Sequence, residues 1–342
     1  MVLFHSTSGP HEVRCVKRNF LLETLEKELP EGTIRYSSKI VAIEEEEGKV
    51  KLLHMADGST IRANVRHMTV QQCISILSEV AYTIGSILCV QVLVGCDGVN
   101  SVVAKWLGLP KPILSGRSAT RGMAEYPDGH GFGPEILQFI GQGFRSGVLP
   151  CSDTSVYWNY TWYPSRKDDG DAEESVAKMR QHVLTKLKGA KIPAEALDVI
   201  ERSEMSDVVS SPLRFRSPLA LVRGSISRGN VCVAGDAFHP MTPELGQGGC
   251  AALEDGVVLA RCLGEAFVGA GNDGGHACVK AALERYAQER RWRAIRLVTA
   301  AYVVGFVQQS SNPAIKFLRE KFLSGLLARV MVDMADFDCG KL

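Results

Sequence analysis

The fold of this chain is decided by the stretch Gly229-Asn-Val-Cys-Val-Ala-Gly235-Asp236-Ala-Phe-His239-Pro240-Met-Thr-Pro243-Glu-Leu-Gly246-Gln247-Gly248-Gly249-Cys250. A short apolar run ends in Gly-Asp, a glycine-rich turn follows, and a helical run starts near Cys250. The pattern therefore predicts a strand, a turn and a helix N-terminus in succession. This order is typical of a site for a phosphorylated cofactor, because glycines let a ligand touch the backbone and a helix N-terminus favours negative charge.

Asp236 stands at the end of the predicted strand, where its carboxylate can accept hydrogen bonds from ligand hydroxyls. Gly246, Gly248 and Gly249 would let a planar ring and phosphates approach the backbone closely. The alternative is a plain strand–turn–helix with a capping Asp. A cap alone needs neither three glycines nor two prolines, so the sequence favours the ligand site.

A second strand-and-turn segment lies upstream and reads Val92-Leu-Val-Gly95-Cys96-Asp97-Gly98-Val99-Asn100-Ser101. Taken alone, a strand followed by Asp-Gly and a helix is equally well explained as a plain turn. Paired with Asp236, which follows Asp97 by 139 residues, it indicates a second strand end at the same kind of site.

A third segment, Arg14-Cys-Val-Lys17-Arg18-Asn-Phe-Leu21, opens a predicted helix over residues 13–29. An arginine here could reach a phosphate or an oxygen of a cofactor ring. A solvated helix arginine explains the same residues equally well.

Composition excludes several classes of function. The chain has 342 residues, 45% of them hydrophobic and 23% charged, with a net charge of +1, so it has room for two domains and nothing points to nucleic acid. The ten cysteines show no C-x-x-C spacing, which indicates reduced core thiols and no metal site. We expect an intracellular protein, cytoplasmic or, if a transit peptide preceded Met1, chloroplastic.

No transmembrane segment is expected. The start of the chain lacks a basic region followed by an apolar core, so no signal peptide is predicted. Residues 82–96 and 297–307 are apolar, but both fall short of the ~20 residues that span a bilayer. A buried strand and a buried helix explain them better, although residues 297–307 could also support peripheral contact with a membrane.

Together the three segments resemble the FAD-dependent aromatic-ring monooxygenases, the family of p-hydroxybenzoate and salicylate hydroxylases and zeaxanthin epoxidase. The plant monooxygenase branch is the most similar, through the run from Gly235 to Asp255. The resemblance implies a mixed α/β fold, with a Rossmann-like FAD- and NAD(P)-binding domain in residues 1–115 and 205–290. It also implies a β-rich substrate domain in residues 116–204 and C-terminal helices in residues 291–342.

The resemblance also implies roles for individual residues. Arg18 before Leu21 matches an arginine that contacts FAD, and Asp97 with Gly98 matches a motif near the FAD pyrophosphate and the pyridine nucleotide. Asp236 matches the aspartate that binds the ribityl chain. The residues matching those that line the isoalloxazine ring are Pro243, Gly246, Gln247, Gly248 and Gly249. Arg216, before Ser217-Pro218, matches an arginine just upstream of the Gly-Asp strand.

The activity that the resemblance implies is the insertion of one oxygen atom of O2 into a small aromatic or isoprenoid-type substrate, with NAD(P)H as reductant. Because the cofactor performs the redox chemistry, no catalytic side chain is predicted. His239 either tunes charge beside the ring or, more simply, packs on Pro240 as a structural histidine. Substrate contacts are expected in residues 117–163, where Trp158, Tyr160 and Trp162 alternate along one strand; core packing is the simpler explanation of that stripe.

The sequence departs from the family at two places. No G-x-G-x-x-G fingerprint lies upstream, and Met1 falls where a family member would already have formed its first βαβ unit. Residues 64–91, which carry a helical apolar pattern, form an atypical insert between two strands. We therefore expect an N-terminally truncated chain, and the alternative to a working enzyme is a catalytically inactive binding or interaction protein.

Overall fold

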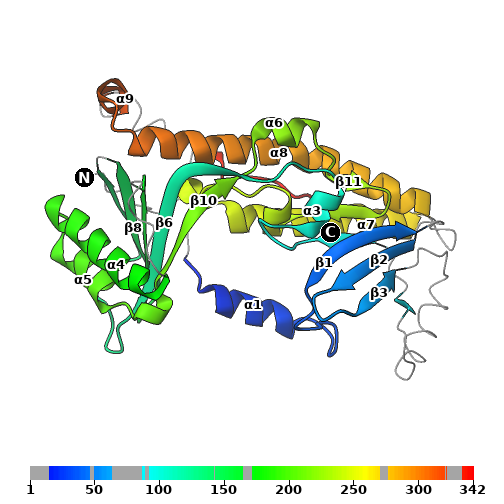
Figure 1. Cartoon of the computed structure of the whole chain (residues 1–342), viewed down its shortest axis with the longest axis horizontal. Coiled ribbons are helices and arrows are strands. Elements are labelled where there is room, and N and C mark those ends of the chain that lie inside the picture. The colour runs from blue at the N-terminus through cyan, green and yellow to red at the C-terminus, as the bar shows by residue number, and fades with distance from the viewer. Residues whose placement is uncertain are drawn as a thin grey trace. The chain divides into compact units, whose positions relative to one another are not determined.

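The computed structural model describes residues 15–46, 50–63, 87–88, 92–141, 143–164, 172–269, 276–319, 321 and 333–342 (Figure 1). The chain divides into two compact units, each built from three stretches of sequence. Unit 1 comprises Met1–Ile34, Leu114–Leu213 and Val303–Arg329; unit 2 comprises Arg35–Ile113, Arg214–Tyr302 and Val330–Leu342. The predicted domain boundaries stay a prediction. They place the cofactor domain in residues 1–115 and 205–290, the substrate domain in residues 116–204 and the C-terminal helices in residues 291–342.

Unit 1 is built on a five-stranded sheet with the order β10-β6-β9-β8-β7. The strands are β6 (Ile113–Glu125), β7 (Leu137–Gly141), β8 (Phe144–Ser152), β9 (Ser155–Trp162) and β10 (Val209–Phe215). The helices of this unit are α1 (Arg18–Lys27), α4 (Ala172–Gly189), α5 (Ala194–Arg202) and α9 (Pro313–Leu318), with the short turn η2 (Met205–Asp207). The β6–β9, β8–β9 and β7–β8 pairs are antiparallel, as the alternating aromatic and β-branched residues of this region predict.

The aromatic stripe of β9 belongs to the core of unit 1. Trp158, Tyr160 and Trp162 are buried, together with apolar residues of α4 and α5 that include Val183 and Ile200. Core packing, the simpler interpretation, is thus confirmed for this stripe, because the helices cover that face. The expectation that substrate contacts come from residues 117–163 stays a prediction.

Unit 2 contains two small sheets, with orders β11-β12-β5 and β1-β2-β3-β4. The first comprises β5 (Leu93–Gly95), β11 (Ser227–Arg228) and β12 (Val231–Val233); the second comprises β1 (Ile40–Glu46), β2 (Val50–Met55), β3 (Thr60–Ala63) and β4 (Ile87–Leu88). The helices are α3 (Val102–Trp106), α6 (Pro218–Arg223), α7 (Gly248–Gly269) and α8 (His276–Gln309), and the last of these continues into unit 1. The buried strand β12 and the apolar faces of α7 and α8 form one core. These layers confirm the mixed α/β class with C-terminal helices.

Two helix predictions need correction. α1 begins at Arg18 and ends at Lys27, so it is shorter at both ends than the predicted stretch. α3, predicted to begin at Val99, begins only at Val102, because the residues before it form the turn that caps it. Within residues 64–91 only Ile87–Leu88 is described; it is a strand parallel to β3, which agrees with the strand expected in residues 82–96. The rest of the segment with the helical pattern lies outside the described residues.

No helix among the described residues is both long and apolar enough to cross a membrane. Of residues 297–307, Leu297, Val298, Ala301 and Val304 are buried. The apolar character of this stretch is therefore largely explained by core packing.

Candidate functional site

Two parallel strands bring the predicted site residues to one edge of a sheet. β12 pairs with β5 in the register Val231↔Leu93 to Val233↔Gly95. The backbone N–H of Ala234 continues the ladder by donating to the carbonyl of Gly95 at 3.0 Å. Asp97 and Asp236 therefore follow the carboxyl ends of neighbouring strands, the edge at which open α/β sheets bind ligands.

The turn after β12 leaves Asp236 at the surface. Gly235 has a φ of +58°, a backbone conformation that L side chains rarely adopt, and the short turn η3 (Gly235–Ala237) follows. An added Cβ at Gly235 would lie 3.3 Å from Cβ of Ala252 on α7, so a side chain would also be crowded. Asp236 itself is exposed, between buried neighbours on both sides. Its carboxylate is thus available to a ligand at the strand end.

The second half of the turn is open along its backbone. η4 (Pro243–Leu245) ends at Gly246, which has a φ of +68°, and α7 begins at Gly248. No atom lies within 4 Å of a Cβ placed on Gly246 or Gly249, and one on Gly248 would meet only Met241 at 3.9 Å. A planar ring could approach this backbone at the N-terminus of a 22-residue helix, whose first N–H groups have no partner within the helix. These residues fit the ribityl and ring side of a flavin.

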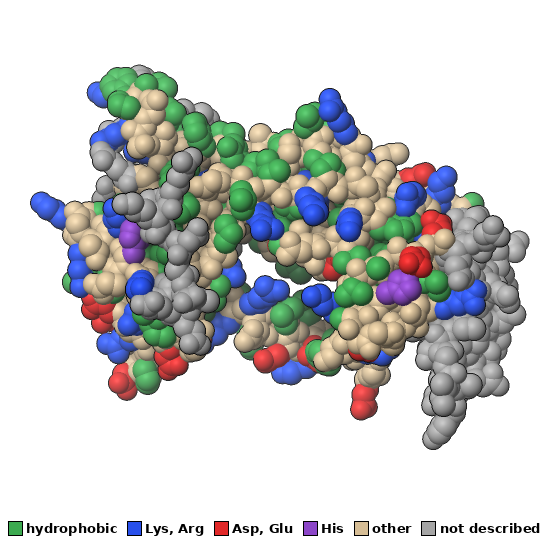
Figure 2. Space-filling view, viewed as in Figure 1, with side chains coloured by type: hydrophobic (Ala, Val, Ile, Leu, Met, Phe, Trp, Pro, Cys, Tyr) green, Lys and Arg blue, Asp and Glu red, His purple; other side chains and the backbone are tan. Residues whose placement is uncertain are grey.

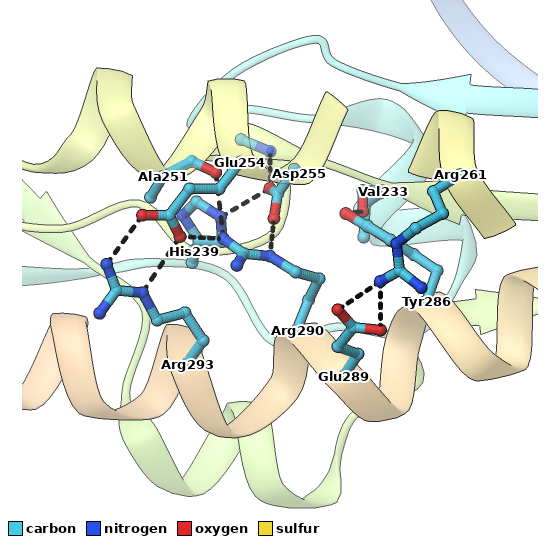
Figure 3. Close-up of polar contacts among 11 residues, drawn as sticks. Val233, His239, Ala251, Glu254, Asp255, Arg261, Tyr286, Glu289, Arg290 and Arg293 are labelled. Atoms are coloured by element: carbon cyan, nitrogen blue, oxygen red, sulfur yellow. Dashed lines mark hydrogen bonds and ion pairs between the residues drawn. The ribbon is translucent and has the colours of Figure 1, made fainter. Parts of the chain in front are cut away.

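A buried carboxylate holds this turn from behind. Asp255 of α7 accepts the backbone N–H of Gly235 at 2.8 Å, pairs with Nε2 of His239 at 2.7 Å and accepts Nε of Arg290 at 2.7 Å (Figure 3). The side chains of Asp255 and His239 are fully buried, and that of Arg290 is 1% exposed. The structural interpretation of His239 fits this geometry, with Asp255 as its partner.

Glu254 extends the network toward the surface. It binds Arg290 at 2.8 Å and Arg293 at 2.7 Å, and Arg293 also donates to the carbonyl of Met334. α7 supplies the two carboxylates and α8 the two arginines, as Figure 3 shows. Burial alone would raise the pKa of Asp255, but the hydrogen bond and charge of His239, the charge of Arg290 and the Gly235 N–H together hold it below its ordinary value.

Arg216 fixes the other side of the turn. Its guanidinium donates to the carbonyls of Phe238 at 2.9 Å and Ala237 at 3.0 Å, and also to that of Pro110. It is 1% exposed, and burial lowers its pKa to about 10. Arg216 therefore satisfies backbone acceptors of the turn, a structural position that the sequence did not reveal.

Asp97, although exposed, folds its carboxylate back onto the start of α3. It accepts Oγ of Ser101 at 2.5 Å and the backbone N–H groups of Val102 at 2.6 Å and Val103 at 3.3 Å. Gly98 makes the turn possible with a φ of +76°. Asp97 thus caps α3 through the same carboxylate that the sequence predicts near a cofactor.

Arg18 is the first residue of α1 in unit 1, whereas the other eight predicted cofactor residues belong to unit 2. The structure brings those eight to one region of unit 2. The role of Arg18 stays a prediction.

A cavity of about 630 Å³ lies in unit 2 between β1, α3 and residues 109–112. Its described lining includes four basic side chains and no acidic one; the basic residues are Lys105, Lys111, Arg214 and Arg216. Figure 2 shows Lys and Arg side chains gathered over the part of unit 2 that carries α3. The cavity therefore suits an anionic ligand.

Sequence reasoning missed the network behind the turn. The only signal for it was the basic run of residues 285–296, which could have been matched with the adjacent Glu254 and Asp255. Among the described residues, no group of three or more His, Cys, Asp or Glu is arranged to hold a metal ion.

Comparison with known proteins yields clear matches. A protein family described as an FAD binding domain matches residues 79–301. Monooxygenase 2 of Arabidopsis thaliana is 43% identical over 98% of this chain and 76% of its own length; Monooxygenase 1 of the same plant is 34% identical over 97% of this chain and 77% of its own length. HpxO from Klebsiella pneumoniae, solved with FAD and uric acid, has the same fold, with a TM-score of 0.67 at 20% identity over 94% of this chain and 72% of that protein.

Proposed function

This chain belongs to the FAD-dependent monooxygenases, and we propose that it binds FAD at the β12–α7 turn and inserts one oxygen atom of O2 into a small aromatic or isoprenoid-type substrate, with NAD(P)H as reductant. The observation that carries the proposal is the exposed Asp236 beside the open backbone of Gly246 and Gly249. Asp255 already stabilises the conformation of this turn. The exposed carboxylate of Asp236 and the two open glycines are therefore not needed for the structure of the turn, which favours a role in binding.

Within this proposal each part of the turn has its own task. FAD, when bound, supplies the electron transfer and the activation of O2. Asp236 would accept hydrogen bonds from the ribityl hydroxyls, and the N–H groups at the start of α7 would supply positive charge near the ring. Asp255, His239 and Arg216 keep the turn in the conformation that binding needs, so that little order is lost when the cofactor binds.

We assign the nicotinamide nucleotide to the basic cavity beside α3. Lys105, Lys111 and Arg214 are exposed on its wall, and their charges suit the phosphates of a dinucleotide. The cavity also adjoins the Asp97-Gly98 turn through Val99 and Asn100, which agrees with the role that the resemblance gives to this motif.

The substrate contacts belong, in our proposal, to the sheet face of unit 1 that α4 and α5 leave uncovered. Tyr157 and Asn159 alternate with the buried Trp158 and Tyr160 and are only half-buried. Arg121 is the register partner of Asn159 in β6 and is exposed. This face offers an aromatic ring, an amide and a guanidinium to a small polar aromatic compound.

A second candidate is a binding or interaction protein without turnover. It is favoured by β5, which has a strand on only one side among the described residues, so that this edge of the parallel sheet is unpaired there. The cysteine pattern and the lack of a spanning helix in the described part of the chain do not separate the two candidates. The cytoplasmic or chloroplastic location stays a prediction.

One experiment separates the candidates. The full chain is titrated with FAD while the quenching of flavin fluorescence is followed, and NADH or NADPH oxidation is then measured with and without candidate aromatic and isoprenoid compounds. Micromolar FAD binding with substrate-stimulated oxidation, and incorporation of label from ¹⁸O2 into product, supports the monooxygenase. FAD binding without oxidation, or no quenching, supports the second candidate. Oxidation without labelled product would point to a different flavin oxidoreductase.

A further inference from the structure

Two cysteines that are 136 residues apart in the sequence meet in unit 1. Sγ of Cys15, just before α1, lies 2.9 Å from Sγ of Cys151 in β8. Both are free thiols and both are half-buried. A disulfide bond is roughly 2.05 Å long, so the two sulfurs need to move less than about 1 Å closer to bond.

The surroundings give the two thiols different reactivity. The hydrogen bond with Cys15, the backbone N–H of Tyr157 and the charge of Lys17 lower the pKa of Cys151, in spite of its partial burial. The same contact and burial raise the pKa of Cys15. Cys151 is therefore the one that ionises first and acts as the nucleophile, with Cys15 beside it as the resolving thiol.

The segment that Cys15 joins to the sheet is otherwise weakly held. α1 has no buried residue, and Phe20 and Leu22 are 65% and 52% exposed. The ion pair between Lys17 and Glu125 of β6, at 2.8 Å, is itself exposed and contributes little. A covalent bond at Cys15 would thus change how firmly the start of α1 is attached, only three residues before Arg18.

We propose that Cys15 and Cys151 are a reversible oxidation site, which forms a disulfide with hydrogen peroxide and anchors α1 to the sheet of unit 1. The Cys151 thiolate attacks one peroxide oxygen and breaks the O–O bond, giving a sulfenic acid and a hydroxide that takes up a proton. The Cys15 sulfur then attacks the Cys151 sulfur, loses its proton and releases the second water. Two thiols and one H2O2 thus give one disulfide and two waters, and a cellular dithiol restores the reduced pair by exchange.

The first test needs only the unaltered full chain. The reduced protein is exposed to graded hydrogen peroxide, free thiols are blocked, and a tryptic digest is made without reductant. We expect mass spectrometry to find residues 15–17 linked to residues 146–166 with the loss of two hydrogens, at a peroxide dose at least several-fold below that which oxidises the exposed thiols Cys96 and Cys250. A pair that stays reduced while Cys96 and Cys250 oxidise would overturn the proposal.

Single variants then test the order of the steps. In Cys15→Ser the sulfenic acid at Cys151 has no partner, so a dimedone adduct should accumulate there; in Cys151→Ser, Cys15 should stay unmodified at the same dose. Cys250→Ser is the matched control and should form the 15–151 link like the unaltered chain. Equal labelling of Cys15 and Cys151 in the two variants would contradict the assigned roles.

A structural measurement tests the consequence. Limited trypsin cleavage after Arg18 and Lys27 should slow at least several-fold on oxidation and recover when dithiothreitol is added, with no such change in Cys15→Ser. Unchanged cleavage in an oxidised chain whose 15–151 link is verified would show that the bond does not anchor α1.

Discussion

The turns after β5 and β12 start alike and use their carboxylates in opposite ways. Both strands lead into a glycine at the same edge of a parallel pair, and an aspartate follows within two residues. Asp97 folds back onto α3: its Oδ2 accepts the first N–H groups of the helix, and its Oδ1 accepts the hydroxyl of the N-cap residue Ser101. Asp236 is exposed like Asp97, but its turn is held by Asp255, which lies on the next helix.

The difference shows what a ligand-binding carboxylate requires. A turn that uses its own aspartate to hold the following helix needs no second carboxylate, but the hydrogen bonds of that aspartate go to the helix instead of to a ligand. A turn that keeps its aspartate free needs a second acidic group, and burying that group requires the cationic Arg290 and a hydrogen bond with His239. Leaving Asp236 available to a ligand therefore depends on a buried, charge-paired carboxylate in the core between α7 and α8.

The largest expected effect comes from the buried carboxylate. Asp255→Asn removes the fully buried partner of Arg290 and leaves it only the pair with Glu254. Removing one partner of a buried pair costs about 3–5 kcal/mol of the free energy of unfolding. Urea denaturation measures the loss. Glu284→Ala, which removes an exposed ion pair with Lys280 on the same helix, is the control and should cost no more than about 0.5 kcal/mol.

Low pH should reduce the stabilisation that the ionised Asp255 contributes to the fold. Because the pKa of Asp255 is lower in the folded chain than in the unfolded one, its ionisation stabilises the fold above about pH 4, and this stabilisation is lost as the pH falls through the folded value. The difference in free energy of unfolding between the unaltered chain and Asp255→Asn should therefore be constant from neutral pH to about pH 5 and shrink below about pH 4. If this difference grew toward acid pH, the pKa of Asp255 would have to be higher in the folded chain than in the unfolded one.

The exposed carboxylate should affect binding instead of stability. Asp236→Ala removes hydrogen bonds to a charged acceptor, so we expect FAD affinity to fall by about 1.5–3 kcal/mol, or roughly 10- to 100-fold. The free energy of unfolding without FAD should stay within about 0.5 kcal/mol. Fluorescence titration and urea denaturation of the same preparations give both numbers. Loss of stability with unchanged affinity would make Asp236 a structural residue and remove the contrast with Asp97.

Local patterns predicted much of this arrangement. The apolar runs before Gly95 and Gly235 predicted two strand ends, and the pattern near Cys250 predicted the start of α7. The family follows from the same motifs and is shown by the relatives. These features depend on neighbours in sequence, which a single chain reveals.

Backbone geometry at a turn and long-range packing decided what the sequence did not predict. The direction of the Asp97 carboxylate depends on the N–H groups of Val102 and Val103, and hence on where α3 begins. Asp255 and Arg290 are 35 residues apart in the sequence, and their hydrogen bond forms only because α7 packs against α8. The β9 stripe belongs to the core because α4 and α5 cover that face of the sheet.

The capping carboxylate should show the opposite behaviour to Asp236. Asp97→Ala removes the acceptor for the first N–H groups of α3, and the loss of such a cap costs about 0.5–2 kcal/mol of the free energy of unfolding. If its carboxylate serves only α3, FAD affinity should not change. A fall in affinity beyond the stability loss would mean that Asp97 leaves its cap when the cofactor binds, and the two turns would then differ less than the structure indicates.

The smallest effect tests whether the open backbone belongs to the ligand. Gly249→Ala meets no atom within 4 Å and needs no unusual φ, so the free energy of unfolding should change by no more than about 0.5 kcal/mol. Its methyl group would stand where a flavin ring approaches the start of α7, so FAD affinity should fall, by less than about tenfold or 1.4 kcal/mol. Gly256→Ala adds the same methyl group further along α7, also in open space, and should leave affinity unchanged. Equal affinities for the two variants would place the ring away from Gly249 and leave Asp236 and Gly246 as the parts of this turn that could meet the cofactor.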